Sequence, residues 1–136
     1  MAYEFATDDW VKALKDELNS SAGYKKAAEK WEGDFYFVVE KSPGIPEDVY
    51  LYMDLWHGEA RDAYLVTDAS AKKTAFELRA DLDVWKGVLA KQLDPIRGIM
   101  SKKLKLKGNM MKVIKTPKAA TELVAAASRI DTTFPG

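Results

Sequence analysis

Residues that commonly carry catalysis are few in this sequence and stand apart from one another. The single histidine, His57, lies beside Gly58, and the chain contains no cysteine. One histidine without a thiol disfavours a zinc site, and the scattered serines form no G-x-S-x-G nucleophile motif. The glycines do not cluster into a phosphate-binding loop. We therefore expect no catalytic residue, no bound metal and no cofactor, and we assign His57 to a surface turn.

Acidic residues occur in close pairs, and paired carboxylates are what glycoside hydrolysis requires. The pairs are Asp8/Asp9, Asp16/Glu17, Glu47/Asp48 and Asp81/Asp83. Each pair falls where a helix should begin, on a helix face or in a loop, where acids cap helices or are solvated. The sequence therefore predicts a protein that is not an enzyme.

The most distinctive stretch covers residues 93–114, LDPIRGIMSKKLKLKGNMMKVI. Between Lys103 and Lys107, lysine alternates with Leu104 and Leu106, which predicts a strand with one dry face and one wet face. Apolar residues flank this short strand on both sides, among them Met110 and Met111. Methionine adapts to variable apolar shapes. The stretch fits either an ordinary corner of the core or a surface that binds an apolar molecule.

Charge is divided unevenly along the chain, although the net charge is zero. Residues 1–83 carry 10 basic and 18 acidic side chains, whereas residues 84–136 carry 11 basic and 3 acidic ones. A basic rim beside an apolar interior would suit an anionic headgroup or an anionic membrane surface, unless folding mixes the charges in space. The lysine strand has no interleaved aromatic residue on which bases could stack, so we expect no nucleic-acid binding.

The elements around this stretch predict an α+β chain that forms one domain over residues 1–136. Caps at Thr7 and at Ser20-Ser21 predict two helices, the second ending at Gly33. Strands are expected at 35–39, 49–56, 61–67 and 74–80, and their short connections predict a four-strand antiparallel meander. Helices are then expected after Asp81, after Asp94-Pro95 and after Thr116-Pro117, with the lysine strand between the last two.

Residues Leu93-Asp94-Pro95, together with the run from Lys103 to Met110 (KLKLKGNM), resemble the C-terminal signature of the sterol carrier protein 2 family. The family usually has a glycine before the lysine strand, where this chain has Ser101 and Lys102. The predicted order of helices and strands also matches that family. The resemblance implies a five-stranded mixed β-sheet, made of the meander and a late fifth strand, with helices on one face and an apolar tunnel between the layers.

The resemblance also implies a non-enzymatic protein that binds and carries a fatty acid, a sterol or another lipid. The alternative is an accessory subunit that presents a hydrophobic substrate to a partner enzyme. With no predicted membrane span and no secretory or peroxisomal signal, we expect a cytoplasmic protein. We expect Lys102, Lys103 and Lys112 to meet a headgroup or a membrane. The apolar residues expected to contact lipid are Phe76, Leu78, Trp85, Leu89, Leu93, Ile96, Ile99, Met100, Met110, Met111, Ile114 and Leu123.

Overall fold

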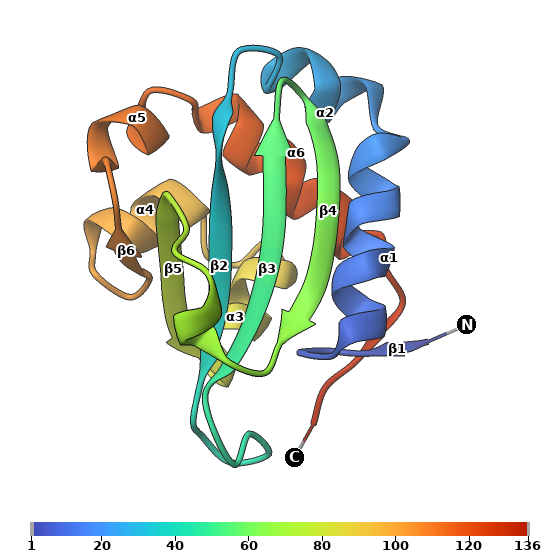
Figure 1. Ribbon diagram of the computed structural model, residues 1–136, viewed down its shortest axis with the longest axis vertical. Helices are drawn as coiled ribbons and strands as arrows, with labels where there is room; N and C mark the ends of the chain where they lie inside the picture. The colour runs from blue at the N-terminus through green and yellow to red at the C-terminus, as the bar shows by residue number, and fades with distance from the viewer. Residues whose placement is uncertain (1, 136) are drawn as a thin grey trace.

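A five-stranded sheet in the order β4-β3-β2-β5-β6 organises the chain in a computed structural model that describes residues 2–135 (Figure 1). Its strands are β2 (Glu32–Glu40), β3 (Val49–Trp56), β4 (Glu59–Val66), β5 (Phe76–Asp81) and β6 (Lys105–Lys107). The helices are α1 (Asp8–Asn19), α2 (Ala22–Ala27), α3 (Leu82–Leu89), α4 (Pro95–Met100), α5 (Met110–Ile114) and α6 (Pro117–Ser128). Two short strands, β1 (Tyr3–Glu4) and β7 (Thr132–Thr133), pair in parallel and bring the two chain ends together.

The prediction of a mixed five-stranded sheet is confirmed, but the four-strand meander is wrong. Strands β2, β3 and β4 form consecutive antiparallel hairpins, whereas β5 pairs with β2 and runs parallel to it. The connection from β4 to β5, which contains the short helix η1 (Ala69–Ala71), therefore crosses the sheet instead of turning back. Tyr36 Oη donates to the Lys72 carbonyl at 2.8 Å and the Ala75 amide donates to Asp34 at 2.7 Å, and both bonds hold this connection over β2. The short connection thus did not imply neighbouring strands.

Helix starts follow the predicted caps. The side chains of Thr7, Ser21, Asp81 and Asp94 each accept a hydrogen bond from the backbone amide three residues later, at the first turn of α1, α2, α3 and α4. The end of the second helix differs from the prediction. Helix α2 stops at Ala27, and Gly33 lies inside β2 because the chain is already extended from Glu32.

The two faces of the sheet are covered differently. Helices α3, α4 and α6 lie behind the sheet in Figure 1, and α1 lies beside β4, while α2 and α5 contact α6. The α-helices thus cover one face as predicted, and the short η1 lies in the connection that crosses the other face. The main apolar core fills the space between this face and the helices. The opposite face carries a small separate cluster of Tyr36, Val38 and Tyr52. Within residues 2–135, no helix has the length and apolar character needed to cross a membrane.

Candidate functional site

An apolar cavity of about 110 Å³ lies between the sheet and the helices. Alternation along the strands places one set of side chains against it, because every second residue of a strand points to the same face. The sheet contributes Phe35, Phe37, Val39, Leu51, Leu55, Leu78 and Leu106. The helices contribute, among others, Val88, Leu89, Ile99, Val113, Leu123, Val124 and Ala127. Such a lining can receive an apolar molecule, and the phenol of Tyr24 is its one titratable side chain.

Aromatic rings form one continuous part of the cavity wall. Trp31 stacks on Phe35 with ring centroids 5.8 Å apart, Phe35 stacks on Phe37 at 5.2 Å, and Phe37 and Trp85 form a T-shaped pair at 6.2 Å. The Trp85 indole N–H donates to the Val38 carbonyl at 2.9 Å. This bond satisfies the one polar atom of the Trp85 side chain, so that its ring can border a dry space.

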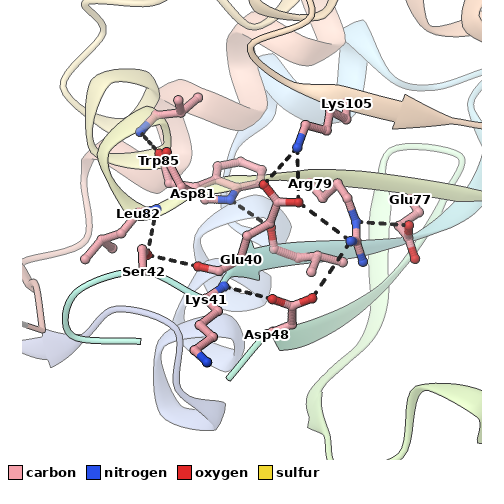
Figure 2. A network of polar contacts seen from close by, with 12 residues as sticks. Glu40, Lys41, Ser42, Asp48, Glu77, Arg79, Asp81, Leu82, Trp85 and Lys105 are labelled. Carbon is pink, nitrogen blue, oxygen red and sulfur yellow. Dashed lines mark hydrogen bonds and ion pairs between the residues drawn. The ribbon is translucent and has the colours of Figure 1, made fainter. Parts of the chain in front are cut away.

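Leu104, Leu106 and Val113 give the β6–α5 region its contact with the cavity. Strand β6 is short and pairs with β5 over three residues, from Lys105 to Lys107. Figure 2 shows a second attachment on the opposite sheet face, where Lys105 Nζ lies 3.2 and 3.3 Å from the two carboxylate oxygens of Glu40. Arg79 Nη1 lies 3.6 Å from the same carboxylate. The ion pairs thus link β2, β5 and β6 behind the cavity wall.

The predicted lipid-contacting residues fall into three groups, namely residues that line the cavity, residues packed near it and three exposed methionines. Those that line the cavity are Leu78, Trp85, Leu89, Ile99 and Leu123. A second group lies in or beside the core without lining the cavity. Phe76 is buried against Trp31 and Phe35. Leu93 and Ile96 are partly buried against the same core, and Ile114 is half-buried.

The methionines depart from the expectation that they face the interior. Met100, Met110 and Met111 are 66%, 44% and 58% exposed, and none of them lines the cavity. The reason is local: α4, which ends at Met100, buries only Gly98 and Ile99, and α5 buries only Val113, so the other sides of these two short helices face solvent. Lipid contact by these methionines would require a ligand or a membrane outside the cavity.

The predicted headgroup lysines also separate. Lys102 and Lys103 are exposed in the turn between α4 and β6. Lys112 folds back over two aromatic rings, with Nζ 4.9 Å from the Trp31 ring centroid and 5.7 Å from that of Phe76, and it donates to the Glu32 carbonyl. Because Trp31 lines the cavity, Lys112 is the candidate headgroup residue nearest to the cavity wall.

Several residues that line the cavity are absent from the set predicted to contact lipid, above all Tyr24 on α2 and the pair Phe35 and Phe37 on β2. The period-two alternation of Phe35, Phe37 and Val39 was the signal that could have revealed the sheet side. Tyr24 has no comparable signal, because one buried aromatic residue on a short helix is equally typical of packed core.

Both ring nitrogens of His57 have a partner in the structure. It lies half-exposed in the turn between β3 and β4, with Nδ1 2.9 Å from the Glu29 carbonyl and Nε2 2.6 Å from a Glu32 carboxylate oxygen. Across residues 2–135, histidine, aspartate and glutamate side chains form no group of three or more that could hold a metal ion.

Comparison with known proteins agrees with this geometry. The sequence model of the SCP-2 sterol transfer family matches residues 11–120. The chain belongs to this family. A crystal structure of sterol carrier protein 2 shares 35% identity with it at a TM-score of 0.84, and the alignment covers 93% of this chain and 99% of that one.

Two further structures show how far the likeness to the SCP-2 family extends. The solution structure of a conserved hypothetical protein from Thermus Thermophilus shares 34% identity at a TM-score of 0.87, covering 98% of this chain and 94% of that one. The UbiJ-SCP2 ubiquinone synthesis protein shares the fold at 18% identity and a TM-score of 0.52, covering 86% of this chain and 84% of that one. No match to the chain is found among the curated proteins.

Proposed function

We propose that this SCP-2 family protein binds a fatty acid, a sterol or a similar apolar molecule in the cavity and carries it without chemical change. The observation that supports this proposal is the cavity itself, whose wall is almost wholly apolar and holds no arrangement of acids or bases. Membership of the SCP-2 family supports lipid binding and transfer in general. We also propose that the ligand is one of these lipids and that the protein works in the cytoplasm.

The cavity must widen when such a ligand enters. At about 110 Å³ it is smaller than the roughly 300–1,000 Å³ of pockets that hold drug-sized molecules. Burial of ten methylene groups would supply about 8 kcal/mol before ordering costs, which is enough for micromolar binding. Widening should begin at the shortest elements of the wall, namely β6, which pairs with β5 over three residues, and α5, which has one buried residue.

We further propose that residues 101–116, the lysine segment, meet an anionic membrane during transfer. The segment holds six lysines and no acidic residue, and it also carries the exposed Met110 and Met111. Basic residues near an anionic surface contribute about 1 kcal/mol each, and apolar side chains can enter the interface. Since the inner side of the same segment lines the cavity, contact there would bring the cavity close to the lipid.

Native mass spectrometry of the purified protein, followed by denaturing extraction, tests the proposed carriage directly. We expect a co-purifying fatty acid, phospholipid or other lipid, and we expect the emptied protein to bind a fluorescent fatty acid with micromolar affinity. A protein that carries no lipid and binds no fluorescent fatty acid would contradict the proposal.

The alternative is an accessory subunit that presents a hydrophobic substrate to an enzyme. The fold likeness to the UbiJ-SCP2 ubiquinone synthesis protein is the observation that favours it. This alternative predicts weak binding of free lipids together with a specific enzyme whose turnover of a hydrophobic substrate depends on the chain. Tight binding of free lipid and efficient transfer between vesicles without any enzyme would count against it.

A further inference from the structure

Tyr24 is the only polar side chain of the cavity wall that lacks a hydrogen-bond partner within the described residues. Four other lining residues carry a polar side-chain atom, and each is already engaged. Trp10 Nε1 donates to Thr132 Oγ1 at 3.0 Å and Trp31 Nε1 donates to the Gly33 carbonyl at 3.0 Å. The Trp85 indole is bonded to Val38, and the Thr116 hydroxyl lies 3.0 Å from the Lys112 carbonyl.

The Tyr24 side chain is held in place although its hydroxyl is not. The residue is 2% exposed and belongs to the main core. Its amide donates to the Ser21 hydroxyl at 3.1 Å, and its carbonyl accepts the Ala28 amide at 2.9 Å, so both backbone groups are fixed in α2. Burial also raises the pKa of the Tyr24 hydroxyl well above its ordinary value, which keeps the proton in place as a donor.

The Tyr24 hydroxyl is unpaired but not sealed off, since Arg79 Nε is the one side-chain nitrogen or oxygen among the described residues that is both fully buried and without a hydrogen-bond partner. Its donor is therefore open to a partner atom that comes within reach of the cavity wall. Phenylalanine would fill nearly the same space but would offer no donor. A hydroxyl in an otherwise apolar ligand cavity has a natural partner, namely an oxygen atom carried by the ligand.

We propose that Tyr24 is the polar anchor of the cavity and donates a hydrogen bond to a hydroxyl or carboxylic acid oxygen of an otherwise apolar ligand. The inference rests on the proposed function and narrows its ligand class. The protein would select lipids that bring one oxygen function into the cavity over hydrocarbons of equal length. It places a polar contact inside the cavity wall, in addition to any headgroup contact made by Lys112 at the surface.

The test compares Tyr24→Phe with Tyr36→Phe, which makes the same chemical change on the opposite sheet face. Tyr36 does not line the cavity, and its hydroxyl is bonded to the Lys72 carbonyl. Each variant is titrated with the fluorescent hydrocarbon diphenylhexatriene, which is then displaced with hexadecanol or with hexadecane.

We expect Tyr24→Phe to weaken hexadecanol binding about two- to tenfold, the range of one neutral hydrogen bond, and to leave diphenylhexatriene and hexadecane binding unchanged. Tyr36→Phe should leave the binding of all three probes unchanged. Because Tyr24 loses no partner in the free protein, its variant should unfold at the same urea concentration as the wild type or at a higher one.

Equal hexadecanol affinity of wild type and Tyr24→Phe, or an equal loss for hexadecanol and hexadecane, would overturn this inference while lipid carriage stands. A wild-type protein that binds none of the three probes would overturn the proposed function, and the inference with it.

Discussion

Filling the cavity from α6 is the sharpest test that it is a binding space and not ordinary core. Ala127 lines the cavity and is 4% exposed, so Ala127→Leu would place three additional carbon atoms there. At about 24 cal/mol per Å³, a cavity of 110 Å³ costs the folded protein about 2.6 kcal/mol. Burial of three carbon atoms is worth about 2.4 kcal/mol. Partial filling should therefore raise the free energy of unfolding by about 1–2 kcal/mol.

The same substitution should weaken ligand binding, because the leucine occupies space that the ligand needs. Loss of room for three methylene groups predicts a drop in affinity of about tenfold or more. Urea unfolding at constant slope measures the first effect, and titration with a fluorescent fatty acid measures the second. Ala125→Leu is the matched control, because Ala125 lies on the same helix but does not line the cavity.

Opposite results would refute the reasoning. If Ala127→Leu lowered the free energy of unfolding by more than about 1 kcal/mol, the usual cost of overpacking, the wall at this position would already be close-packed. If the fatty acid bound to Ala127→Leu as tightly as to Ala125→Leu, the ligand would lie elsewhere.

Three further predictions concern the lysine segment and the open sheet face. Met110→Asp should change fatty-acid affinity in solution by less than about twofold, because Met110 does not line the cavity, but should slow transfer from phosphatidylserine vesicles relative to phosphatidylcholine vesicles. Lys105→Ser removes an exposed ion pair with Glu40, so it should cost less than about 1 kcal/mol of unfolding free energy and speed amide hydrogen exchange in β6. Burial raises the pKa of Tyr52 from 10.0 to about 12, so the folded state keeps a proton that the unfolded state loses, and stability should fall as pH rises across that window. Urea unfolding of Tyr52→Phe should show a smaller alkaline loss than the wild type, and an identical loss would contradict this assignment.

The local order of the chain could be predicted from sequence because it depends on neighbouring residues. Thr7, Asp81 and Asp94 cap the helices that their types and positions indicated, and the lysine alternation gave β6. The placement of β5 could not be obtained in this way. It depends on a connection that crosses β2 and is held by Asp34, a contact between residues 41 positions apart that no local pattern records.

The cavity lining was only partly predictable, because a sequence pattern does not show whether the space between the apolar side chains is filled. Apolar residues at strand and helix spacing indicate a dry interior, and they do so equally for packed core and for an unfilled space. Phe76 and Leu78 are two positions apart in β5 and point to the same face of the sheet. Leu78 nevertheless borders the cavity, whereas Phe76 packs against Trp31 and Phe35.

The exposed methionines show a second limit, namely that an apolar residue type does not guarantee burial. An apolar residue type indicates the interior only when the element that carries it has a buried face wide enough to receive it. Helix α5 buries Val113 alone, so Met110 and Met111 remain outside. Two adjacent exposed methionines in a segment without acidic residues are what the proposed membrane contact of the lysine segment requires. The segment that appeared in the sequence to be the interior of the binding site therefore divides into an inner wall, made by Leu104, Leu106 and Val113, and an outer surface.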